Sequence, residues 1–87
     1  MITLEELLNR YLAGERNFEQ ISSRFGALIN QDLSKINLSR TNLDRISLIE
    51  CNLSKADLSN ANLFGSNLEG MNLSDANLHQ TNFRVCF

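Results

Sequence analysis

The chain has little charge of one sign and no long apolar run. Eight Lys or Arg residues stand against ten Asp or Glu residues, which leaves a formal net charge of -2. Strong electrostatic capture of nucleic acid or of an acidic membrane surface is therefore not expected. No apolar stretch approaches the roughly 20 residues that span a bilayer. Glu5 and Glu6 stand where a signal peptide has its basic and apolar segments, so we expect a soluble, cytoplasmic protein.

Cysteine and histidine are also scarce. The chain has two cysteines, Cys51 and Cys86, and a single histidine, His79, which is near neither of them in sequence. A disulfide framework or a metal site requires closer, clustered ligands. We therefore expect no metal and no cofactor, and we interpret both cysteines as buried thiols that act as small hydrophobic residues.

Leucine is abundant, and it recurs at every fifth position. An α-helix turns each five-residue step by about 140° net, so the leucines would scatter around its axis. A flat strand would send alternate leucines to opposite faces. The chain must therefore bend once per repeat, which predicts an all-β solenoid with every leucine pointing inward. The leucines on this grid are Leu28, Leu33, Leu38, Leu43, Leu48, Leu53, Leu58, Leu63, Leu68, Leu73 and Leu78, with Phe18 and Phe83 at either end.

The other positions of the five-residue unit are also patterned. The residue two before each leucine is mostly small or apolar, as in Ile46, Cys51 and Ala56, which predicts a second inward-facing position. The residue directly before the leucine is almost always Asn or Asp, and these side chains tolerate turn conformations and bond to nearby backbone groups. The two residues after the leucine are varied and polar, so we expect them to face solvent.

These units resemble the A(D/N)LXX signature of the pentapeptide-repeat family. The clearest examples are residues 56–60, 61–65 and 76–80, and the resemblance covers residues 31–83 and reaches back towards Phe18. It implies a right-handed quadrilateral β-helix with four quintets and twenty residues per coil. A junction like residues 14–18, following an N-terminal capping helix, is similar to short members of the family abundant in cyanobacteria.

The N-terminal residues predict a short helix over 3–13. Thr3 and Glu6 have the spacing of a capping box, and Gly14 is a typical C-terminal stop. Residues 1–15 are thus expected to form an α-helical cap on a solenoid of about three and a half coils, spanning 16–87. We expect its first part, 16–30, to be irregular and 31–85 to be regular. The apolar stripe expected to cover the open first coil consists of Leu4, Leu7, Leu8, Tyr11 and Leu12.

Two departures from the pattern stand near the ends of the solenoid. Ser23 occupies a centre where Leu or Phe is expected, and Phe25 falls off the inward grid. At the other end no second cap is visible. Either the tail over 83–87 folds across the last coil, or two chains meet end to end through Phe83, Val85 and Phe87; the second alternative is favoured.

A filled interior leaves only the outside and the ends for function. Ile29, Ile49 and Glu69 stack in one outward column, and Asp44, Phe64 and Arg84 in another, where Phe64 is expected to lie against Arg84. Ile29, Ile49, Phe64 and Arg84 are the candidate interaction residues, although Ile49 and Phe64 are assigned to different corners or faces.

The sequence therefore predicts a non-catalytic scaffold that binds another protein. His79 shares a column with Ser39 and Ser59, but an open face without an orienting acid or oxyanion donors predicts a solvated ladder and no catalysis. The alternative function implied by the family is DNA mimicry directed at DNA gyrase. Residues 31–85 carry five basic and six acidic residues, a net charge of -1, which is a poor imitation of duplex DNA.

Overall fold

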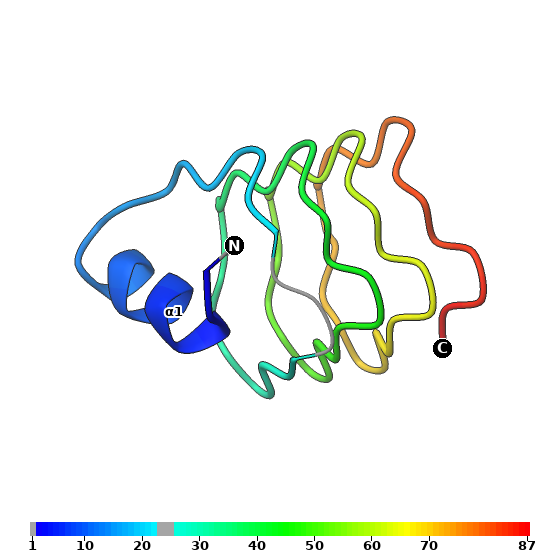
Figure 1. The fold of residues 1–87 in the computed structure, drawn as a ribbon, viewed down its shortest axis with the longest axis horizontal. Helices are drawn as coiled ribbons and strands as arrows, with labels where there is room; N and C mark the ends of the chain where they lie inside the picture. Colours follow the sequence, from blue (N-terminus) through cyan, green and yellow to red (C-terminus); the bar gives the residue numbers. More distant parts are fainter. Residues whose placement is uncertain (1, 23–25) are drawn as a thin grey trace.

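The computed structural model describes residues 2–22 and 26–87 of the 87-residue chain. The chain forms a stack of coils with the helix α1, Leu4–Leu12, at one end and the C-terminus at the other (Figure 1). The principal extents are 32 × 25 × 23 Å. Ser23 and Phe25, the two expected departures near the first coil, lie outside the described residues.

Neighbouring coils pair through single residues and not through longer strands. Ten parallel bridges each join a residue to the one twenty positions later, from Asn17 with Asn37 to Asn62 with Asn82. No strand longer than one bridge occurs in residues 2–22 and 26–87, because the chain turns again after each quintet. A coil of twenty residues built from five-residue units has four sides, which confirms the expected quadrilateral. Residues 17–22 and 26–30, where an irregular coil is expected, pair in this same register.

The interior is filled by the leucines and by the position two residues before each of them. Leu53, Leu58 and Leu63 have no exposed surface. The second inward position is confirmed, and its polar members find partners inside: Thr41 Oγ1 donates to the Leu38 carbonyl at 2.7 Å, and Ser66 Oγ donates to that of Leu43 at 3.2 Å. No buried side-chain N or O atom of the described residues lacks a hydrogen bond.

The turn conformation falls on a different residue from the one expected. The Asn or Asp before each leucine bonds to the backbone as predicted; Asp32 Oδ1, for example, accepts the Ser34 N–H at 3.0 Å. The left-handed backbone conformation, however, belongs to the second residue after the leucine, because the chain turns at that corner from one side of the coil to the next. Its φ lies between 54° and 70° in the corner residues Lys35, Arg40, Arg45, Glu50, Lys55, Asn60, Gly65, Gly70, Asp75, Gln80 and Val85.

The first residue after the leucine is also less exposed than its polarity predicts. Ser39 is 5% exposed and Asp44 is 6% exposed, although both were expected to face solvent. Adjacent coils are about 4.8 Å apart, so the flat middle of each side is covered by neighbouring side chains. In this middle part of the solenoid the corner residues Arg40 and Arg45 are exposed, whereas the residue directly before each of them is buried.

Helix α1 begins and ends close to the predicted residues. The Thr3 Oγ1 accepts the Glu6 N–H at 3.0 Å, which is one of the two bonds of the predicted capping box, and Gly14 follows the helix with a φ of 103°. Leu7 and Tyr11 are buried against the coil. The prediction for Leu12 is wrong: its side chain is 73% exposed, because α1 packs on a stripe narrower than the sequence pattern.

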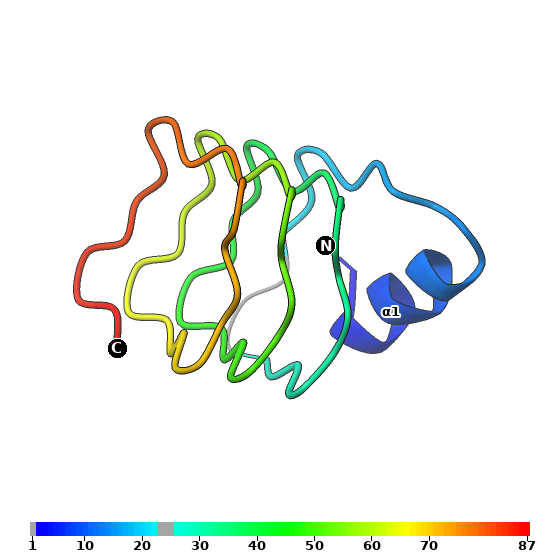
Figure 2. The ribbon, with the colours of Figure 1, turned by 180° about the vertical axis from the view of Figure 1, so that it is seen from behind.

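The N-terminal segment also reaches the backbone of the first coil. Ile2 N–H donates to the Ser22 carbonyl at 3.2 Å, and the Tyr11 hydroxyl donates to the Ser34 carbonyl at 2.8 Å. Both carbonyls lie on the edge of the first coil that no other coil covers. Figures 1 and 2 show α1 lying beside that edge from both directions.

At the opposite end the tail extends the coil. Leu68 N–H donates to the Phe87 carbonyl at 2.9 Å, and Phe87 N–H donates to the Ser66 carbonyl at 3.1 Å. These are the bonds that join any two successive coils, so the alternative in which the tail folds over the end is wrong. Leu78, Val85 and Phe87 are exposed on this last coil.

Candidate interaction surface

The described residues hold no group of His, Cys, Asp or Glu side chains suited to a metal ion. No helix among them is long and apolar enough to cross a membrane. Since leucines fill the interior, any site must use outward side chains.

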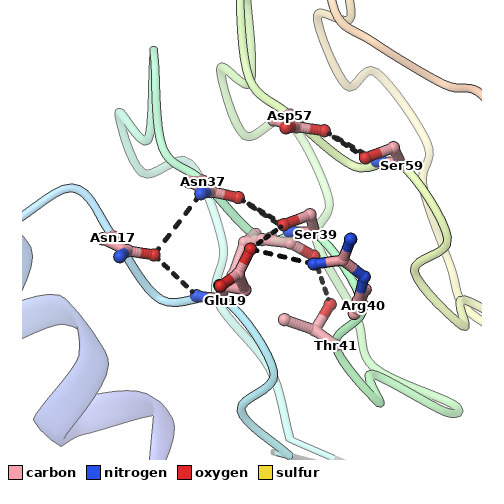
Figure 3. Close-up of polar contacts among 9 residues, drawn as sticks. Asn17, Glu19, Asn37, Ser39, Arg40, Thr41, Asp57 and Ser59 are labelled. Atoms are coloured by element: carbon pink, nitrogen blue, oxygen red, sulfur yellow. Dashed lines mark hydrogen bonds and ion pairs between the residues drawn. The ribbon is translucent and has the colours of Figure 1, made fainter.

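A polar side of the solenoid contains Ser39 and Ser59, which Figure 3 shows, and His79 lies one coil further in the same column. Ser59 Oγ donates to Asp57 Oδ1 at 2.6 Å, and Ser39 Oγ donates to Asn37 Oδ1 at 2.8 Å. Ser74 makes the same bond to Asn72 two residues before it, at 2.6 Å. Because the same contact recurs at these three serines, it is a feature of the repeat and not the mark of an activated nucleophile.

A short ionic contact joins two coils on the same side. Glu19 Oε2 accepts Arg40 Nη1 at 3.1 Å and Ser39 Oγ at 3.4 Å (Figure 3). Asn17 Oδ1 accepts the Asn37 side-chain amide at 3.4 Å. These contacts join the first coil to the second. Ion pairs on the surface contribute little to stability.

The twenty-residue register places all the large apolar outward side chains on two neighbouring sides. Among described residues 16–22 and 26–87, this set, which we call the apolar band, consists of Ile29, Ile49, Phe64, Val85 and Phe87. The side centred on Leu28, Leu48 and Leu68 holds Ile29, Ile49 and Phe87. The preceding side holds Phe64, and Val85 is at their common corner.

This arrangement changes the interpretation of the predicted residues. Ile49 and Phe64 do lie on different sides, but these sides meet at the corner column of Arg45, Gly65 and Val85. Ile29 is 53% exposed and Phe87 is 79% exposed, whereas Ile49 and Phe64 are half-buried. The side chains at the two ends of the band, Ile29 and Phe87, are therefore more exposed than Ile49 and Phe64 between them.

The cation beside Phe64 is not the predicted one. The Arg45 guanidinium lies 5.4 Å from the centre of the Phe64 ring, and its Nη1 also contacts Asp44 Oδ2 at 3.0 Å. Gly65 explains this geometry, because a Cβ built there would be only 3.1 Å from Arg45 Cγ. The glycine leaves room for the arginine stem to lie across the corner. Arg84, the predicted partner of Phe64, is exposed on the last coil.

Two acidic residues accompany these apolar residues: Glu69 stands in the column of Ile29 and Ile49, and Glu50 stands at the corner on the outer edge of the band. Glu50 N–H donates to the Glu69 carbonyl at 2.8 Å, so these residues occupy adjacent coils, and both side chains are exposed. On the next coil the corner residue beside Glu50 is Gly70, where an added Cβ would be 3.0 Å from Glu50 Cγ. Along the solenoid axis, this side therefore presents Ile29 and Ile49, then the two acidic residues, and then Phe87. The repeat pattern placed Glu69 in the column of Ile29 and Ile49, whereas the position of Glu50 beside it comes from the register between coils.

The cysteines behave as structural thiols. Cys51 is buried, its Sγ donates to the Leu28 carbonyl at 3.0 Å, and burial raises the pKa of its thiol above 9.0. Cys86 Sγ makes the equivalent contact with the Leu63 carbonyl at 3.0 Å but is only half-buried, since no coil follows it. Neither position has the electropositive surroundings of a reactive thiol.

Comparisons with known proteins agree with this architecture. The family described as "Pentapeptide repeats (8 copies)" matches residues 32–70 and 51–86. Among solved structures, HetL, a pentapeptide repeat protein involved in heterocyst differentiation regulation from the cyanobacterium Nostoc sp. strain PCC 7120, matches with a TM-score of 0.90 and 33% identity over 93% of this chain. The chain spans 34% of the length of HetL.

Two other pentapeptide repeat proteins of known structure match with lower TM-scores. The protein alr5209 from Nostoc PCC 7120 is 32% identical over 91% of this chain and 74% of its own, with a TM-score of 0.35. Rfr23 from the cyanobacterium Cyanothece 51142 is 24% identical over 95% and 92%, with a TM-score of 0.29. The comparison with curated proteins found no match.

Proposed function

The chain belongs to the pentapeptide-repeat family, whose fold is a right-handed quadrilateral β-helix, and from this premise we propose that it is a non-catalytic module that binds another protein through the apolar band. One observation supports this most directly: every large apolar outward side chain of the described coils lies on two neighbouring sides. Apolar residues gathered on one surface are typical of protein interaction sites, whereas single scattered ones are not.

The absence of catalysis is part of the proposal. Leucines and small residues fill the interior, and the serines of the polar side bond to the Asn or Asp two residues before them. HetL is described as involved in heterocyst differentiation regulation. A regulatory role through protein contact, in the cytoplasm, is the corresponding proposal for this chain.

The competing function, mimicry of DNA towards gyrase, fits the charge poorly. Duplex DNA carries one negative charge per about 1.7 Å, so a length matching the 32 Å long axis would carry about 19. The whole chain has a net charge of -2, and residues 31–85 have a net charge of -1. A gyrase supercoiling assay separates the two functions: inhibition or protection at micromolar protein would favour mimicry, and we expect neither.

The band is tested by comparing partners captured from the native host. Ile49→Arg and Phe64→Glu change the band, and Ser74→Lys places a charge outside the band, on the adjacent side centred on Leu73, as the control. Circular dichroism first establishes that all three variants fold. We expect at least one protein to be captured by the wild type and by Ser74→Lys and lost with both band variants. An unchanged set of captured proteins would refute the band as the interaction surface.

A second contact is proposed at the open coil. The last coil presents exposed Val85 and Phe87 beside half-buried Phe83, and two chains meeting end to end would cover all three. Sedimentation of Phe87→Asp against the wild type tests this contact. We expect a concentration-dependent dimer that the substitution dissociates; equal masses for the two proteins would contradict it.

We also propose that α1, with its predicted cap residues Thr3, Glu6, Leu7, Leu8 and Tyr11, shields the first coil from association. The bonds from Ile2 and Tyr11 to first-coil carbonyls and the burial of Leu7 support this role. Exposed coil edges otherwise pair with other chains. Light scattering of Leu7→Asp should show aggregation with the coil signal retained in circular dichroism; a monodisperse, folded variant would remove the shielding role.

A further inference from the structure

We propose that the side bearing Ile29, Ile49, Glu69 and Phe87 binds an amphipathic α-helix of the partner, laid along the solenoid axis. The helix would present leucine-like residues at positions i, i+3 and i+10 and a basic residue at i+7, or the same pattern reversed. This inference rests on the proposed function and specifies the partner's chemistry.

The spacing of the coils supports a helix. The four residues lie on successive coils: Ile29, Ile49 and Glu69 differ by twenty and form one column, and Phe87 lies on the next coil in the column of Asn67, two residues or about 6.6–6.8 Å to the side. With coils about 4.8 Å apart, their heights along the axis are about 0, 4.8, 9.6 and 14.4 Å. At 1.5 Å per residue, helix positions i, i+3, i+7 and i+10 lie at about 0, 4.5, 10.5 and 15 Å. The two series agree within about 1 Å at each step.

An extended segment fits this side less well. Alternate residues of a strand face the same way and are about 6.6–6.8 Å apart. A strand laid along the axis would therefore be out of step with the coils after one repeat. A helix presents a continuous stripe on one face at these four positions, and its diameter of about 10–12 Å also covers the lateral step from Glu69 to Phe87, so all four contacts form together.

The charges specify the third position. Glu69 and Glu50 are exposed in adjacent coils. Arg45 lies at the opposite corner with its guanidinium on Phe64 and Asp44, and Arg84 lies on the preceding side. A lysine or arginine facing the acidic pair is attracted to it, whereas an acidic residue there is repelled. The coil before Glu69 offers an apolar contact at Ile49, and the coil after Glu69 offers one at Phe87.

The probe for this proposal is a labelled, alanine-based helical peptide with Leu at i, i+3 and i+10 and Lys at i+7. A second peptide has the reversed order, because the helix can run in either direction. Two control peptides complete the set: one replaces Lys with Glu, and one has the same composition with the leucines spread around the helix. Binding to the full chain is measured by fluorescence anisotropy.

The protein variants are Ile29→Lys, Glu69→Lys and the control Ser74→Lys, which lies on the adjacent side outside the proposed site; all three are at outward positions. We expect one of the two lysine peptides to bind, and Ile29→Lys and Glu69→Lys each to weaken that binding at least tenfold. Ser74→Lys should change it less than twofold. Glu69→Lys should bind the glutamate peptide better than the lysine peptide, which is a reversal that simple misfolding cannot produce.

Three results would overturn the helix as occupant. The first is no binding of either lysine peptide at millimolar concentration, and the second is equal binding to all variants. The third is a wild-type dimer that Ile29→Lys dissociates in sedimentation, which would assign the side to a second copy. If these occur while Ile49→Arg still loses a captured protein from the host, the interaction module stands and only the helix is wrong.

Discussion

Leu58 and Leu78 form a matched pair for testing whether the interior is as tightly filled as the proposed function requires. Both occupy the same inward column, one coil apart, but Leu58 is completely buried and Leu78 is 37% exposed on the last coil. Replacing either by alanine removes the same atoms. The difference in stability between the two variants therefore reports the packing around each leucine.

The expected losses differ by about a factor of two or more. Leu58→Ala leaves a cavity enclosed by neighbouring coils, and such substitutions cost about 2–5 kcal/mol. Leu78→Ala opens to solvent, so only the transfer of its covered part is lost, about 1–2 kcal/mol on the usual scale for leucine. With a urea m value of about 1.5 kcal/mol/M, a loss of about 3 kcal/mol lowers the unfolding midpoint by about 2 M.

The measurement is urea unfolding followed by circular dichroism, at low and high protein concentration. A loss below about 1 kcal/mol for Leu58→Ala would refute the filled interior and reopen the possibility of an internal site. Equal losses for the two variants would mean that another surface covers the last coil. In that case the loss for Leu78→Ala should decrease on dilution, as it would for an end-to-end dimer.

Three further outcomes are expected. Maleimide should modify half-buried Cys86 at least tenfold faster than buried Cys51, whose pKa is raised; equal rates in the folded protein would contradict this. Gly65→Ala should destabilise the protein by about 1–3 kcal/mol in thermal unfolding, because φ is 69° and the arginine stem of the preceding coil lies 3.1 Å from the new Cβ. Unchanged stability would mean that the corner relaxes freely. Arg10 holds the pKa of Glu15 below its ordinary 4.5, mainly through a side-chain hydrogen bond, so this pair stabilises the fold above pH 4.5 and the effect is lost as the pH falls through the lowered pKa. Glu15→Gln should therefore reduce the slope of acid unfolding, and an identical slope would refute this contribution.

Much of the fold follows from the sequence because one physical constraint repeats. A leucine at every fifth position has only one way to stay buried, which is a chain that bends after each quintet. The same logic predicted the second inward position, confirmed by the burial of Ile46, Cys51 and Ala56. Helix α1 was predicted from its cap and its apolar stripe, and its bounds agree within a residue. The exposed Leu12 shows the limit of this reasoning, since only the packed structure decides how wide a stripe is covered.

Which outward side chains lie next to one another could be decided only from the tertiary structure. Side chains that share a surface come from residues twenty apart and from neighbouring quintets, so their contacts depend on the number of sides and the coil register. The pattern of Asn and Asp indicated turns, yet the left-handed residue is the corner three positions later. Phe64 was matched to Arg84 by its column, but the empty corner at Gly65 brings Arg45 to the ring instead.

The sequence by itself thus determined a packed solenoid with no room for an internal site, because burial of a regular leucine grid is a local, repeated requirement. It also named the residues that break the outward pattern, among them Ile29, Ile49 and Phe64. Only the tertiary structure decided that these residues join Val85 and Phe87 on two neighbouring sides, with an acidic pair beside them. That decision rests on the parallel register of twenty residues, a long-range property that no single quintet contains.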